Sequence, residues 1–247
     1  MNRVRWRIFL AVALIMLAGV MYLLYYALYR DSQTIVTWLL MSTAFLPINI
    51  LIVTLIVDGI ISKRDKQARL KKLNMVVGVF YSDGGIEILK QLSLFNSNKE
   101  QFGRDLICNG SWTRQDFGQA AKKVQSYDCR VDSRLGDLGS LRALLVGKKD
   151  LLLRLLENPH LLDHETFTDL LWAVFHLQDE LIHRGDLTRL SMVDYNHISQ
   201  DMNRAYRLLI SEWLSYMGHL RKDYPHLYSL AMRINPFDPA AAPEIKE

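Results

Sequence analysis

The sequence has few cysteines and none of the common catalytic signatures. Its two cysteines, Cys108 and Cys129, form neither a close pair nor a CxxC motif, so we interpret both as reduced thiols. No GxSxG nucleophile motif occurs, and the glycines at 139 and 147 lack the spacing and the Ser/Thr of a phosphate-binding loop. These absences argue against a hydrolase or a nucleotide-dependent enzyme, and we expect no cofactor.

Charge is missing from two long stretches near the N-terminus, residues 8–29 and 34–57. About 20 apolar residues in a helix cross the hydrocarbon core of a bilayer, where the backbone must satisfy its own hydrogen bonds. The sequence therefore predicts a transmembrane hairpin over residues 1–62, with spans at about 8–29 and 34–61. The first stretch exceeds the roughly 7–15 apolar residues of a signal peptide and ends in tyrosines, so we expect an uncleaved anchor.

Positive charge is concentrated beside this hairpin. The first 72 residues hold ten Lys and Arg against three acids, a net +7, whereas the remainder holds 20 against 23, a net −3. By the positive-inside rule, the cations that flank the spans place both termini in the cytoplasm, in an inner or plasma membrane. The mildly acidic remainder argues against a nucleic-acid partner.

A basic neck, residues 63–81, follows the second span and is expected to continue it as a helix. Its cations predict contact with the lipid bilayer through anionic headgroups. They are Lys63, Arg64, Lys66, Arg69, Lys71 and Lys72.

The second span carries polar residues, whereas the first is apolar on all faces. Ser42 and Asn49 are seven residues apart and share a helix face, and Pro47 lies near the middle of the span. Polar side chains at this depth point at another helix or at a water-filled path. We interpret the face as helix packing in a homo-oligomer; the alternative is a pore lined by second spans.

Residues 82–235 predict a cytoplasmic helical domain. The overall fold class is therefore an all-α membrane protein, a two-helix transmembrane hairpin followed by an α-helical bundle. Residues 82–85, with two glycines, predict a break and a hinge. Helix starts are indicated by Thr113-x-x-Asp116, by Asp163 and by Ser191-x-x-Asp194, and 148–157 predicts a short helix. Residues 129–139 are interpreted as a loop.

Two apolar stripes mark the buried faces of the longest predicted helices. The second helix, nearly thirty residues ending at about 222, is expected to form the spine of the bundle. The tail at 236–247, with three prolines, is expected to be disordered or to lie along the surface. The stripes consist of Phe167, Leu170, Leu171, Val174 and Leu181 in the first helix, and of Tyr195, Ile198, Met202, Ala205, Leu209, Trp213, Tyr216 and Leu220 in the second.

The one cluster of metal-ligating residue types is His176, Glu180 and His183, which share a helix face. Glu180-x-x-His183 has the spacing of di-iron carboxylate bundles, and Asp194-x-x-His197 offers a second pair. This face is opposite the apolar stripe, so we expect it to meet water. No metal site is predicted, and the three residues stand only as candidates.

The leading functional hypothesis is a non-enzymatic two-pass membrane protein. Its cytoplasmic domain would mediate self-association or bind a protein partner whose identity the sequence leaves open. The alternatives are a small oligomeric ion channel lined by the second span and a membrane-tethered His/Glu metalloprotein.

Overall fold

The computed structural model describes residues 3–126, 129–158, 161 and 164–244, and these form an all-helical protein. Within these ranges there is no β-strand, and one isolated antiparallel bridge joins Asn96 to Val131. The helical fold class predicted from the sequence is confirmed. The chain divides into two compact units, Met1–Lys66 and Gln67–Glu247.

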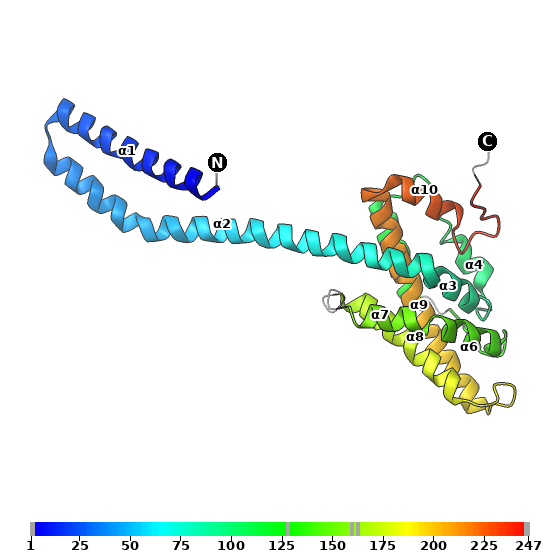
Figure 1. Ribbon diagram of the computed structural model, residues 1–247. Helices are drawn as coiled ribbons and strands as arrows, with labels where there is room; N and C mark the ends of the chain where they lie inside the picture. The colour runs from blue at the N-terminus through cyan, green and yellow to red at the C-terminus, as the bar shows by residue number, and fades with distance from the viewer. Residues whose placement is uncertain (1–2, 127–128, 159–160, 162–163, 245–247) are drawn as a thin grey trace. The chain divides into compact units, whose positions relative to one another are not determined.

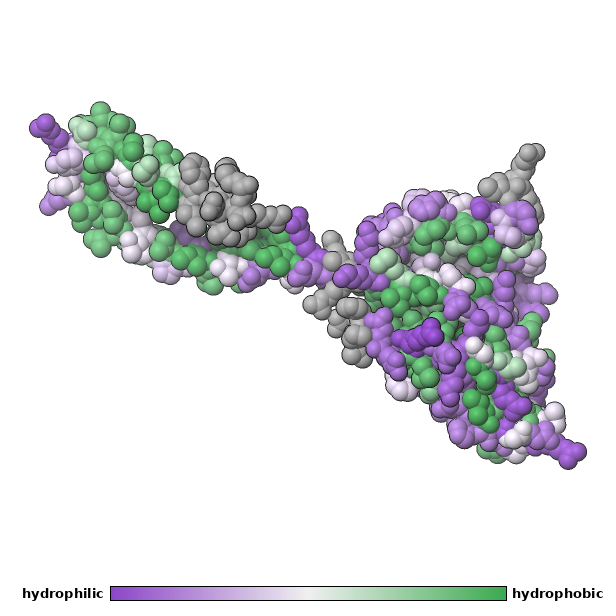
Figure 2. Space-filling model, in the orientation of Figure 1, coloured by the Kyte–Doolittle hydropathy of each residue, from purple (hydrophilic) through white to green (hydrophobic). Residues whose placement is uncertain are grey.

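The first unit consists of α1 (Arg3–Tyr29) and the beginning of α2 (Ser32–Phe80), joined by a tight turn. Arg30 adopts a left-handed backbone (φ 47°) there, and the Asp31 carboxylate accepts the backbone N–H of Gln33 at 3.0 Å. The helix region Val12–Tyr29 and a stretch inside Ser32–Ser93 are long and apolar enough to cross a membrane, and their most apolar windows are 0% buried. Figure 2 shows apolar residues over the visible face of this unit.

The neck is helical, as expected, but the predicted break at the glycines is wrong. α2 passes into a π-helical turn (Tyr81–Gly85), which leads directly into α3 (Ile86–Ser93). Gly85 has ordinary helical dihedral angles (φ −59°, ψ −39°) and is buried. A Cβ at Gly85 would lie 2.7 Å from Cε1 of Phe80. The Phe80 ring can occupy this position only because residue 85 has no side chain. The glycine serves close packing rather than a hinge.

The second unit is built around α9 (Met192–Asp223). This long helix contacts α3, α5 (Arg114–Ser126), α8 (Glu165–His183) and α10 (Pro225–Arg233). Figure 1 shows α8 and α10 beside it. The stripe predicted for α8 is buried throughout; in α9 its members are buried except Tyr195 and Tyr216, which are half-buried. The hydroxyl of Tyr81 donates to the carbonyl of Leu209 at 2.7 Å, which ties the π-helical turn to the middle of α9.

Two of the predicted helix starts have the expected caps. The Ser191 hydroxyl accepts the backbone N–H of Asp194 at 3.1 Å, and the Thr113 hydroxyl accepts that of Asp116 at 3.4 Å. α8 differs, because its cap is His164, whose Nδ1 accepts the backbone N–H of Phe167 at 3.1 Å. Asp163, the predicted cap, lies outside the described residues.

The remaining helices are short. α4 spans Lys99–Arg104, and α7 (Lys149–Leu156) matches the helix predicted over 148–157. α6 (Leu138–Gly147) has no predicted counterpart. Its cap, Asp137, accepts the backbone N–H of Gly139 at 2.8 Å. Asp137 belongs to the polar segment 129–139, which is interpreted as a loop from the sequence. The start of α6 was therefore not predicted.

The tail adopts the second of its two expected conformations as far as the structure describes it. The Phe237 ring lies 5.3 Å from that of Trp213, and Nε of Arg233 donates to the carbonyl of Pro243 at 3.0 Å. Residues 236–244 thus lie against the helical unit. Residues 245–247 are outside the described part.

Candidate functional site

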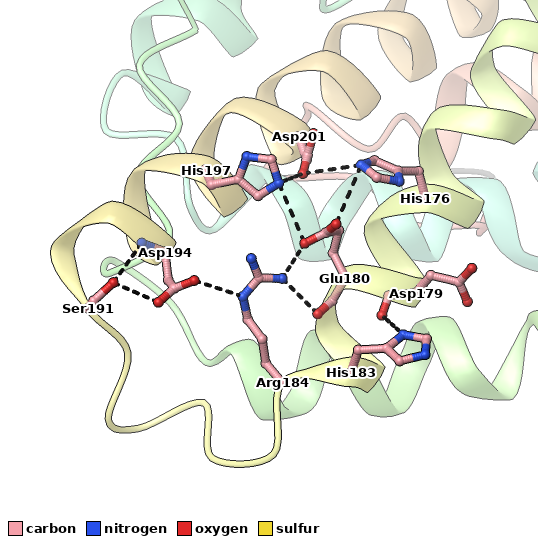
Figure 3. Close-up of polar contacts among 9 residues, drawn as sticks. All are labelled: His176, Asp179, Glu180, His183, Arg184, Ser191, Asp194, His197 and Asp201. Carbon is pink, nitrogen blue, oxygen red and sulfur yellow. Dashed lines mark hydrogen bonds and ion pairs between the residues drawn. The ribbon is translucent and has the colours of Figure 1, made fainter.

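Four side chains of α8 and α9 converge where the two helices lie side by side. His176 and Glu180 are four residues apart on α8, and His197 and Asp201 are four apart on α9, so each pair shares a helix face. The connection between the helices, residues 184–191, is short and returns the chain along α8. Figure 3 shows the two pairs facing one another, with histidines and acids alternating.

The imidazole nitrogens and carboxylate oxygens of this cluster lie 3.4–3.8 Å apart. Nε2 of His176 is 3.6 Å from Oδ2 of Asp201 and 3.8 Å from Oε1 of Glu180. Nε2 of His197 is 3.4 Å from the same Asp201 oxygen and 3.5 Å from Oε2 of Glu180. Each imidazole nitrogen therefore faces both carboxylates.

The acids form the floor of the cluster and the histidines its rim. The side chains of Asp201 and Glu180 are 14% and 24% exposed, against 52% and 48% for His176 and His197. Oδ2 of Asp201 is buried and has no hydrogen-bond partner among the described residues. The expectation that this face of α8 meets water holds for His176 and His183, which are exposed, whereas Glu180 is partly covered and lies beside His197 of α9.

Arg184 holds the Glu180 carboxylate in place. Its guanidinium bonds the Glu180 side chain, donates to the Glu180 carbonyl at 2.9 Å, and reaches Oδ1 of Asp194 at 3.4 Å. The Arg184 hydrogen bond lowers the pKa of Glu180, so this residue is an anion at neutral pH. Asp194 contacts the Ser191 cap and Arg184, whereas His197 faces Glu180 and Asp201. The structure therefore does not bring the candidate pair Asp194 and His197 together.

His183, the third candidate from the sequence, points away from the cluster. Its Nδ1 lies 2.8 Å from the carbonyl of Asp179 in its own helix, as Figure 3 shows. Of the three candidates, His176 and Glu180 lie together in the structure and His183 does not join them. Asp201 was not among the candidates, because no pattern within one helix reveals which face of the next helix lies opposite.

The other predicted site residues lie on the surface of α2. Ser42, Pro47 and Asn49 are exposed in the first unit. The described basic side chains are exposed too, with Nζ of Lys71 5.9 Å from the centre of the Tyr224 ring; the Arg69 side chain lies outside the described part. The roles predicted for both sets stay predictions. The exposed basic residues are Lys63, Arg64, Lys66, Lys71 and Lys72.

An open groove of about 510 Å³ lies in the second unit between the end of α2, α9 and α10. Apolar and aromatic side chains dominate its lining, and Met75 and Val79 of α2 are 54% and 57% exposed. Tyr216, Tyr224 and Leu227 stand on the other side. The groove is therefore a concave, largely apolar surface. One of the helices that line it, α2, also carries the second apolar stretch.

Comparison with known proteins places the chain in a family. Residues 69–233 match the C-terminal helical domain of "uncharacterized protein MJ1433", and residues 2–61 match the N-terminal helical domain of MJ1433. The chain belongs to the MJ1433 family. Uncharacterized protein MJ1433 of Methanocaldococcus jannaschii is 41% identical over 238 residues, 96% of each chain. No solved structure matches this MJ1433 family member.

Proposed function

We propose that this MJ1433 family member is a two-pass protein of the cell membrane, with both termini in the cytoplasm. The observation that carries the proposal is the exposure of the two apolar helical windows, which are 0% buried. A core helix of a soluble protein would be covered by its own chain, because exposing a continuous apolar surface to water is unfavourable. A bilayer supplies the missing cover.

The cations at the edge of the hairpin support the same orientation. Lys63, Arg64 and Lys66 are exposed on α2 just after its apolar part. Each Lys or Arg near an anionic leaflet contributes roughly 1 kcal/mol of attraction. The neck therefore holds the cytoplasmic side in place and contacts anionic headgroups.

Two measurements test the membrane proposal. The chain should stay in the membrane pellet after alkaline carbonate extraction, because an integral hairpin is held by its apolar surface rather than by charge. A C-terminal tag should be digested by protease only after the cells are opened. Recovery in the supernatant without detergent, or digestion of the tag on intact cells, would overturn the topology.

The proposed function of the protein is self-association, without catalysis. The proposed occupant of the groove is a second copy of this chain. The groove is lined by Met75 and Val79 of α2, and the same helix carries the exposed polar residues Ser42 and Asn49. Polar residues on a membrane helix favour contact with another helix. Two chains that associate through Ser42 and Asn49 would also hold their second units at a high local concentration, which favours contact between the exposed apolar side chains of the two grooves.

Cysteine crosslinking in native membranes tests this interface. Both natural cysteines are buried, so a cysteine introduced on the surface dominates the reaction. Val79→Cys should give dimers with a short bis-maleimide. Val146→Cys, on exposed α6 surface away from the groove, is the matched control and should stay monomeric. A monomer for both variants contradicts the proposal.

A channel remains the second candidate because α2 combines Pro47 with exposed Ser42 and Asn49. In that arrangement the shared polar face would line a pore between several copies. Ion flux through liposomes that contain the protein, reduced by Asn49→Leu, would favour the channel. A sealed bilayer would leave self-association alone.

A further inference from the structure

We propose that His176, His197, Asp201 and Glu180 bind one divalent transition metal ion of the zinc class. The inference is independent of the membrane proposal, since all four residues belong to α8 and α9, which lie within the second unit. It replaces the ligand set suggested by spacing alone, in which His183 took part.

The distances between the donor atoms fit a small four-coordinate ion. Zinc bonds imidazole nitrogen and carboxylate oxygen at about 2.0–2.2 Å, so tetrahedral donors stand roughly 3.3–3.6 Å apart. The nitrogen-to-oxygen distances in the cluster run from 3.4 to 3.8 Å. The donor atoms of His176, His197 and Asp201 all lie within 4.8 Å of one another. Binding would draw these three donors closer together, with Glu180, which lies outside that group, as the fourth ligand.

The chemistry of the donors selects the class of metal. Two imidazoles with carboxylates suit zinc and its neighbours, whereas calcium and magnesium prefer shells made of oxygen alone. Asp201 contributes the second, independent observation: its buried Oδ2 has no hydrogen bond and is aimed between the two imidazole nitrogens. A buried polar atom without a hydrogen bond is unfavourable, and a cation between the carboxylate and the imidazoles would satisfy it.

The surroundings complete the arrangement expected of a metal site. Arg184 fixes the Glu180 carboxylate through a side-chain hydrogen bond, as outer partners do for metal ligands. The half-exposed histidine rings leave the cluster open to ions from solution. Because the ligands come from two helices, bound metal would join α8 to α9 and stabilise their pairing.

Metal titration of the full chain in mild detergent tests the proposal. After chelator treatment and dialysis, Co²⁺ should bind with one equivalent per chain and give visible d–d absorption, and Zn²⁺ should displace it. His197→Gln and Asp201→Asn should each weaken binding by about 100-fold or more, beyond the 10–100-fold typical of lost outer partners. His183→Gln, on the same helix as His176 but outside the cluster, is the matched control and should bind like the natural protein.

A stability measurement keeps the test decisive if Asp201→Asn perturbs folding. His197 is half-exposed, so His197→Gln should retain the fold, which circular dichroism without metal would verify. Zn²⁺ should then raise the melting temperature of the natural chain and of His183→Gln but not that of His197→Gln. Absence of one-equivalent binding would overturn the site and leave only ion pairs between histidines and acids. Equal loss in His183→Gln and His197→Gln would also overturn it.

Discussion

Replacing Gly85 with alanine should destabilise the helical unit, although alanine is the better helix former. The new Cβ would lie 2.7 Å from Cε1 of Phe80 and 2.9 Å from Cδ1 of Tyr81. The Phe80 ring cannot retreat, because it is fully buried and packs edge-on against Phe167 at 5.5 Å between ring centres. Overpacking of this kind costs about 1–3 kcal/mol.

Gly118 supplies the matched control for this substitution. It lies inside α5, is exposed, and has no atom within 4 Å of an added Cβ. Both substitutions gain up to about 1 kcal/mol of helix propensity, so that gain cancels when the two variants are compared. Gly85→Ala should therefore be less stable than Gly118→Ala by about 1–3 kcal/mol.

Unfolding of the full chain in mild detergent, followed by near-ultraviolet circular dichroism, measures this difference. For a unit of this size each kcal/mol corresponds to about 2–4 °C in melting temperature. Gly118→Ala should melt at or above the natural protein and Gly85→Ala below Gly118→Ala. Equal melting temperatures for the two alanine variants would refute the packing role of Gly85 and restore the idea of a flexible hinge.

Four further predictions concern three side chains. Burial raises the pKa of the Cys108 thiol to about 11, against an ordinary 9.0, so iodoacetamide should label it about 100-fold more slowly than a free thiol at pH 7.5. The fold favours the protonated thiol, so stability should decline as pH rises from about 9 through 11, and Cys108→Ser should alter that decline. Asn235→Ala should cost about 1–3 kcal/mol in urea unfolding, because the buried amide donates to the Leu106 carbonyl at 3.1 Å. Ser191→Ala should cost about 1 kcal/mol in the same assay through loss of the α9 cap, whereas Ser191→Thr, which keeps the hydroxyl, should preserve it.

The sequence by itself determined the features that depend on neighbours along the chain. Helical periodicity is local, so it assigns Phe167 and Trp213 to buried faces, and both side chains are buried in the fold. Helix caps are local as well, since the Ser191 hydroxyl reaches a backbone N–H only three residues away. Two uncharged stretches likewise predicted two long apolar helices.

Tertiary structure decided what depends on contacts between distant segments. Gly85 suggested a hinge in the sequence, and only the packed Phe80 ring shows why a residue without a side chain stands there. His176 and Asp201 are 25 positions apart, and no periodicity within one helix indicates that their side chains meet. The reason is physical: spacing fixes the face of a helix on which a residue lies, whereas the pairing of α8 with α9 fixes what that face meets.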